Sequence, residues 1–293
     1  MNPSLTTKWG ASPRTTGIAI AFLGAVLMSF DPIFIRFSGV SGVDTAFLFG
    51  LFTALSMAWF VQRQDPNGLL GALRHGGLPL LLSGLLMLGS ASSLVLSIKL
   101  TSVANTFVIL SASPAIAALF SWLLLREVTS RQTWVAIGAV MIGIGIVVSG
   151  AYQSGYWLGD LLALVAVTCI SLLQTLMRKF PEISRMASVG LGGALLALVM
   201  LIFAEPASYS LHTWLVMAAM GLFSAPFGRV LSQVATRYIT APEVGMILIV
   251  ETVFAPLWAF GFFGEVPANS SFLGGAIILL TLIWYTKASN QAQ

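Results

Sequence analysis

Residues 100–147, LTSVANTFVILSASPAIAALFSWLLLREVTSRQTWVAIGAVMIGIGIV, form two apolar segments joined by a short polar turn. Residues 239–283 repeat this plan, and Glu265 in the second copy aligns with Glu127 in the first. Long apolar segments separated by a few polar residues predict a pair of membrane helices. Because the pair occurs twice, we expect the chain to contain the same structural unit twice.

The repeat extends upstream to the beginning of each unit. Residues 17–36 and 159–178 align without a gap, and both segments end in arginine. The two copies are therefore half-chains, 1–150 and 151–293. Each half is predicted to hold the same set of helices, because an internal repeat means that one structural unit occurs twice.

The composition is that of a membrane protein. Hydrophobic residues make up 57% of the 293 residues and charged residues only 8%, whereas soluble domains are about 25% charged. A helix that crosses the membrane needs about 20 apolar residues, so ten helices fill the chain. We therefore expect an all-α integral membrane protein with ten transmembrane helices. The predicted spans are 16–37, 44–61, 77–98, 103–125, 134–149, 158–177, 186–203, 211–235, 243–263 and 271–286.

Basic residues predict the orientation. With a cytoplasmic N-terminus, eleven of the 14 lysines and arginines fall inside, Arg36 and Lys99 fall outside, and Arg229 lies within a span. Because excess Lys and Arg mark the cytoplasmic side, both termini are predicted to be cytoplasmic. Five spans per half is an odd number, so the second half enters the membrane from the opposite side and the repeats are inverted.

Three charged residues fall inside predicted spans, namely Asp31, Arg229 and Glu251. A charge at mid-bilayer costs about 3 kcal/mol or more and usually faces a bundle interior or a water-filled path. Asp31 and Glu251 are candidate pathway residues, with carboxylates that bond their own helix as the alternative. Arg229 is a candidate counter-charge for either carboxylate, or an anchor for an anionic substrate group.

Prolines interrupt several of the same spans. Pro32 and Pro114 are the candidates for the substrate pathway, and Pro226 and Pro256 lie in spans eight and nine. Each proline removes a backbone hydrogen bond and frees a carbonyl that protein or water must satisfy. These residues predict kinked helices around a shared cavity, although membrane helices also tolerate proline without such a role.

Polar side chains at helical spacing support the cavity. Ser90 and Ser93 share a face of span three, and Ser171 and Gln174 share a face of span six. Helix-to-helix contact is the alternative for the serines, since hydroxyls often join membrane helices. Gln174 is harder to explain in that way.

Aromatic side chains complete the predicted site. Phe34 lies on span one and Trp258 lies inside span nine, away from the span ends where most of the tryptophans fall. Such rings suit an apolar or aromatic substrate side chain. The alternative is that they face lipid or the protein core.

Common enzyme motifs are missing from the sequence. It holds no Gly-x-x-x-x-Gly-Lys phosphate loop, no His-Glu-x-x-His and no Gly-x-Ser-x-Gly. We therefore predict no catalytic residues, no metal site and no cofactor. The net charge of +4 is interpreted as membrane orientation and not as nucleic-acid binding.

The motifs resemble those of a known family. The spacing from Pro114 to Glu127, and Glu251 with Glu265 in the second copy, are similar to those of ten-helix EamA-type exporters of the drug/metabolite transporter superfamily. Thr252 follows Glu251 where the family pattern has proline. The resemblance covers nearly the whole chain. It implies a central substrate cavity among spans 1, 3, 4, 6, 8 and 9, with spans 5 and 10 at the periphery.

The resemblance is strongest to bacterial amino-acid exporters, including the aromatic amino-acid group. It implies a multi-pass protein of the bacterial inner membrane that exports neutral or aromatic amino acids by alternating access. A membrane-embedded enzyme acting on lipid or prenyl groups is the alternative, followed by a flippase or a non-transporting subunit. The expected partners are an amino-acid substrate and membrane lipids. A homodimer and proton coupling are both left open.

Overall fold

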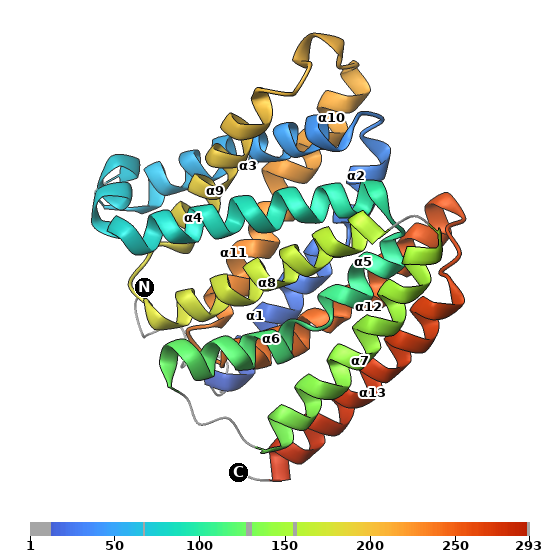
Figure 1. The fold of residues 1–293 in the computed structure, drawn as a ribbon. Helices are drawn as coiled ribbons and strands as arrows, with labels where there is room; N and C mark the ends of the chain where they lie inside the picture. The colour runs from blue at the N-terminus through green and yellow to red at the C-terminus, as the bar shows by residue number, and fades with distance from the viewer. Residues whose placement is uncertain (1–12, 67, 127–130, 155–156, 292–293) are drawn as a thin grey trace.

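The computed structural model describes residues 13–66, 68–126, 131–154 and 157–291, and every regular element in these ranges is a helix (Figure 1). The predicted turn at 126–133 and the predicted external loop at 151–156 lie partly outside the described residues. The helices are α1 (Pro13–Met28), α2 (Asp31–Phe37), α3 (Gly42–Gln64), α4 (Gly68–Leu100), α5 (Val103–Leu110), α6 (Ser113–Phe120), η2 (Ser121–Leu125), α7 (Arg131–Ser154), α8 (Trp157–Lys179), α9 (Arg185–Leu201), η3 (Pro206–Ser208), α10 (Leu211–Ala219), η4 (Met220–Ser224), α11 (Ala225–Ala235), α12 (Ala241–Phe263) and α13 (Asn269–Gln291).

Seven helical stretches of the described chain are long and apolar enough to cross a membrane. They are Pro13–Phe37, Gly42–Gln64, Gly68–Leu100, Val103–Leu125, Trp157–Lys179, Leu211–Ala235 and Ala241–Phe263. Three shorter apolar helices, Trp134–Ile146, Arg185–Leu201 and Asn269–Thr281, occupy the places of the fifth, seventh and tenth predicted spans. The all-helical membrane architecture is confirmed, and the number of ten spans stays a prediction.

The prolines differ in what they do to the backbone. Pro32 and Pro114 each lie near the start of a new helix, so that α1 breaks before α2 and α5 breaks before α6. Pro226 is near the start of α11, directly after the π-helical turn η4. Pro256, in contrast, lies inside α12, which continues to Phe263. Proline has no N–H to donate, so it is tolerated where a helix begins.

The helices form two flanks around a centre. On one flank α3 packs against α9 and α4, and at the opposite edge α7 and α13 run side by side (Figure 1). Small residues bring this last pair together, since a Cβ on Gly143 would lie 3.0 Å from the carbonyl oxygen of Gly274. Gly143 therefore allows close packing on a neighbouring helix of the same chain, whereas a Cβ on Gly138 or Gly145 would meet nothing within 4 Å.

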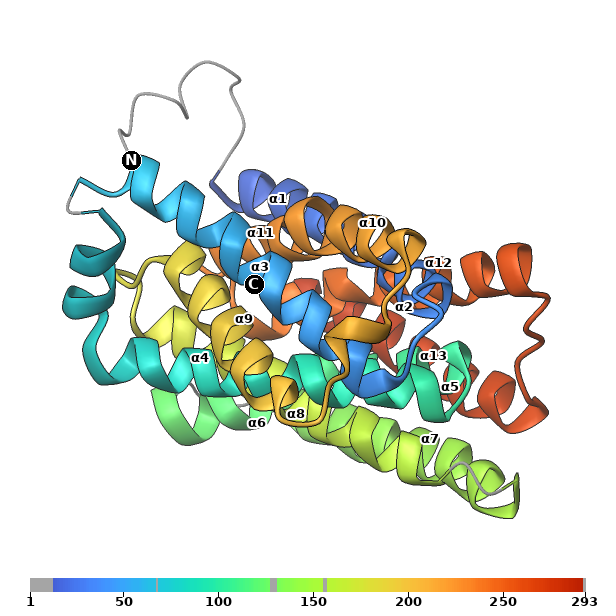
Figure 2. The same ribbon diagram turned by 90° about the horizontal axis from the view of Figure 1, so that it is seen from above.

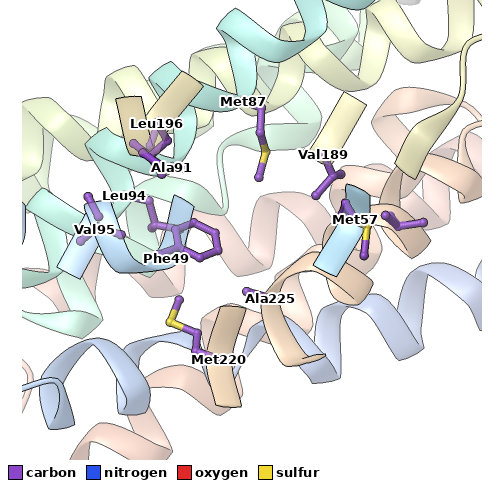
Figure 3. Packing of buried hydrophobic residues seen from close by; sticks show 14 of the residues in the cluster. Phe49, Met57, Met87, Ala91, Leu94, Val95, Val189, Leu196, Met220 and Ala225 are labelled. Carbon is purple, nitrogen blue, oxygen red and sulfur yellow. The ribbon is translucent and has the colours of Figure 1, made fainter. Parts of the chain in front are cut away.

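The centre contains α1, α5, α6, α8, α11 and α12, which are also visible from above in Figure 2. Its apolar core continues into the α3, α4 and α9 flank. Figure 3 shows part of this core, where Phe49 lies beside Leu94 and Val95. Phe49 is fully buried, and its ring contacts Arg229 of the site described below.

Two glycines set the distance between α1 and α11. A Cβ on Gly24 would lie 2.9 Å from the carbonyl oxygen of Gly228, and a Cβ on Gly228 would lie 3.0 Å from that of Gly24. Neither position has room for a larger side chain without movement of the backbone. This close approach matters for the site because Arg229 follows Gly228 on α11.

We expect the substitution Gly228→Ala to lower the stability of the folded protein by about 1–3 kcal/mol, because the added methyl group overpacks the crossing. Gly261→Ala is the matched control, since a Cβ at Gly261 has nothing within 4 Å and alanine is the better helix former. Thermal unfolding in detergent measures both variants. An unchanged midpoint for Gly228→Ala would contradict the requirement for close approach.

Candidate functional site

A cavity lies at the centre of the bundle, with about 70 Å³ open to the centres of water-sized groups. One water needs about 10–15 Å³ on this scale, so the cavity has room for a handful of such groups. Its walls come from six of the ten predicted spans, the same six that the family resemblance implies. The lining residues are Met28, Asp31, Met87, Ser90, Leu94, Phe107, Leu110, Ser113, Val167, Ile170, Leu173, Gln174, Arg229, Ser232, Gln233, Leu248, Glu251 and Thr252.

The two helix breaks form part of the cavity wall. Met28 and Asp31 flank the break between α1 and α2, and Leu110 and Ser113 flank the break between α5 and α6. Pro32 and Pro114 themselves do not line the cavity. Their effect is on the backbone, because each starts a new helix whose first residues face the cavity.

Asp31 and Arg229 form an ion pair inside the bundle. Arg229 Nη1 donates to Asp31 Oδ2 at 2.8 Å, and the two side chains are 2% (Asp31) and 11% (Arg229) exposed. Arg229 also donates to the carbonyl oxygen of Ala225 at 3.2 Å, and its guanidinium carbon lies 4.7 Å from the centre of the Phe49 ring. The structure thus favours one of the two roles considered for Arg229, that of counter-charge to a carboxylate.

Glu251 lines the same cavity from α12 and is 9% exposed. It is close enough to Asp31 and Arg229 to interact electrostatically with both. In the described residues, however, Glu251 has no hydrogen bond or ion pair. Glu251 is therefore the carboxyl group of the site that has no partner.

Two buried glutamines face the cavity from different helices. Gln174 of α8 donates through Nε2 to Ser232 Oγ at 3.5 Å, and Gln233 of α11 lies next to that serine. The Oε1 atoms of both glutamines are buried and have no hydrogen-bond partner among the described residues. Gln233 was not among the predicted site residues, although it shares a polar face of its span with Arg229.

The remaining predicted residues lie at or behind the cavity wall. Ser90 lines the cavity and donates to the carbonyl oxygen of Met87 at 3.0 Å. Ser93 is buried but is not part of the lining. Ser171 lies one layer behind, where its hydroxyl donates to the carbonyl oxygen of Ser113 at 3.2 Å.

The two aromatic candidates contact protein and not the cavity. Trp258 stacks on Phe30, with 5.3 Å between ring centres, and its Nε1 donates to Ser29 Oγ at 3.3 Å. Trp258 therefore packs against the break between α1 and α2. Phe34 is partly buried and packs against the large apolar core.

Polar contacts join separate chain segments at one end of the bundle. Glu265 accepts hydrogen bonds from the backbone N–H of Val103 at 2.5 Å and from Arg36 Nη2 at 3.3 Å. Arg36 Nη2 also donates to the carbonyl oxygen of Thr101 at 3.1 Å. All of these residues lie on the predicted external side.

A related contact lies on the predicted cytoplasmic side, where Arg178 Nη1 donates to the carbonyl oxygen of Ile239 at 3.3 Å. The sequence repeat aligns Arg178 with Arg36 and Ile239 with Thr101. The two contacts therefore join equivalent positions of the two half-chains. Glu127, which aligns with Glu265, lies outside the described residues.

The comparisons with known proteins agree with this architecture. The model of the EamA-like transporter family matches residues 15–149 and again residues 157–286. These matches cover most of the chain, so the protein belongs to the EamA-like transporter family.

Twenty solved chains match the structure. One crystal structure covers 94% of this chain and 98% of its own chain, with a TM-score of 0.69 and 17% sequence identity. A likeness at this identity shows the fold alone. None of the curated proteins matches the sequence.

The charge arrangement predicts unequal effects of removing each member of the ion pair. We expect Arg229→Gln to cost about 3–5 kcal/mol, because it leaves Asp31 buried without a counter-charge. Asp31→Asn should cost less, since Glu251 remains near Arg229. The double variant should recover most of the stability lost in Arg229→Gln. Thermal unfolding of the three purified variants tests this order, and equal losses for the two single variants would contradict it.

Proposed function

We propose that the protein is a secondary transporter that exports small metabolites, most of all neutral and aromatic amino acids. The observation that carries the proposal is the central cavity, which combines charged and polar side chains with apolar walls inside a membrane bundle. Ligand sites typically have such a composition, with a few placed polar groups in an apolar pocket. Membership in a transporter family favours transport over a membrane-embedded enzyme.

Alternating access of two inverted halves is the proposed mechanism. In support, Arg36 bonds the carbonyl oxygen of Thr101 while Arg178 bonds that of Ile239, and the sequence repeat relates these positions. Substrate sites between inverted repeats lie near the membrane midplane, often beside broken helices. The breaks before Pro32 and Pro114 fit that arrangement.

Flux into liposomes tests the function. We expect vesicles that contain the purified protein to take up labelled neutral amino acids, and Gln174→Leu to lower this flux about fivefold, since one hydrogen bond is worth about 1 kcal/mol. Gln64→Leu, at the exposed end of α3, is the matched control and should transport normally. If the vesicles move no amino acid, the substrate assignment is wrong, even where another solute is moved.

The orientation proposed is that of a bacterial inner-membrane protein with both termini in the cytoplasm. The asymmetry of basic residues supports it. We expect a cysteine at Ala207, in the exposed segment before α10, to react with an impermeant maleimide in intact cells, whereas a cysteine at Pro66 reacts only after lysis. Both are introduced after replacement of Cys169. The reverse pattern would overturn the orientation.

A further inference from the structure

Several hydrogen-bond acceptors of the residues that line the cavity have no partner in the described part of the chain. Asp31 Oδ1, Gln174 Oε1 and Gln233 Oε1 are buried without a partner among the described residues, and Glu251 lines the same space without a hydrogen bond. These four groups come from α2, α8, α11 and α12. An unsatisfied buried acceptor costs about 1–3 kcal/mol, and a charged one costs more. A group with several donors would therefore be bound favourably here.

The cavity also contains a carboxyl group without a counter-charge. Asp31 and Arg229 neutralise each other at 2.8 Å, which leaves Glu251 without an ion-pair partner in the described residues. A buried carboxyl group in this situation holds a proton, and a cation that enters the cavity would replace that proton and pair with the carboxylate. The missing partner is thus both a cation and a donor of several hydrogen bonds.

We propose that this cavity is a binding site for a primary ammonium group, held by Glu251 and by the amide oxygens of Gln174 and Gln233. An R–NH₃⁺ group carries three N–H donors and one positive charge, which matches the vacant acceptors and the unpaired carboxyl group of Glu251. Met87, Leu94, Phe107 and Leu248 line the cavity as well and suit an apolar stem, which an inorganic cation lacks. The inference rests on the proposed transport function and names the chemistry by which its substrates are recognised.

The positive charge of Arg229 is already paired with Asp31 in this site. Arg229 Nη1 donates to Asp31 and to the carbonyl oxygen of Ala225, and the guanidinium lies over the Phe49 ring. A substrate carboxylate would have to share this positive charge with Asp31. The substrate class is therefore small primary amines, whether or not they carry a carboxylate, and amino acids bind through their amino end.

Binding to the purified full-length protein in detergent at pH 7 tests the inference, by calorimetry or by the shift in thermal midpoint that a ligand produces. The probes are n-butylamine with its isosteres 1-butanol and butyrate, and alanine with alaninol and propionate. We expect n-butylamine, alaninol and alanine to bind, and the alcohol and the two carboxylates not to bind. This comparison uses the unchanged protein, so it does not depend on the folding of a variant.

Variants then locate the site. Glu251→Gln should weaken the binding of n-butylamine and alaninol about tenfold or more, as expected for the loss of a hydrogen bond to a charged group. Glu205→Gln removes an exposed carboxylate outside the cavity and should bind both amines as the unchanged protein does. Gln233→Leu should weaken the same probes without affecting the ion pair of Asp31 with Arg229.

Three results would overturn the inference. Binding of alanine and propionate without alaninol or n-butylamine would show recognition through the carboxylate. Unchanged amine affinity in both Glu251→Gln and Gln233→Leu, or no binding of either amine to the unchanged protein, would remove the ammonium site. Liposome flux distinguishes failure of this inference from failure of the proposed function. A transporter that recognises its substrate in another way still moves a solute, whereas a protein without transport activity moves none.

Discussion

The ion pair between Asp31 and Arg229 is the constraint on which the centre of the structure depends. Two charges inside an apolar bundle are each costly, and the cost is offset when they meet each other at short range. The pair joins α2 to α11, and it can form because α1 and α11 cross at two glycines. The close helix crossing, the ion pair and part of the cavity wall thus lie on the same two chain segments.

Side-chain hydroxyls of other helices donate to backbone carbonyl groups beside both helix breaks. Near the first break, the hydroxyl of Ser224 donates to the carbonyl oxygen of Leu27 at 2.8 Å. Near the second, the hydroxyl of Thr252 donates to that of Phe107 at 3.0 Å. Thr252 aligns with Pro114 in the repeat. One half-chain therefore has the proline at this position, and the other has a hydroxyl that bonds the segment leading to that proline.

The sequence could predict the membrane class, the helices and the charged residues, because these depend on local composition and on the cost of burying charge. The breaks at Pro32 and Pro114 were predictable for the same reason, since proline acts on its own backbone. The rotation of each helix was not. Trp258 and Gln174 are both polar-tipped residues inside spans, yet Trp258 contacts Ser29 and Phe30 while Gln174 faces the cavity. Only the contacts between helices decide such directions.

Gln233 is a site residue that the sequence did not predict. Its position on one face with Arg229 was visible in the sequence, but that face could equally have met a neighbouring helix. What marks it as part of the site is an amide oxygen that is buried and without a partner, which no sequence pattern reveals.

The two half-chains contribute different parts of the site, and no sequence pattern reveals this division either. The breaks before Pro32 and Pro114 come from the first half, whereas Arg229 and Glu251 come from the second. Among the described residues, Arg229 of the second half is the ion-pair partner of Asp31 of the first. A movement of one half against the other must therefore either carry this pair intact or give Arg229 another carboxylate. Glu251 lies on the same half as Arg229 and is placed to be that carboxylate. A cation bound to Glu251 would keep Arg229 paired with Asp31. Occupancy of the cavity would then be coupled to the contact between the halves.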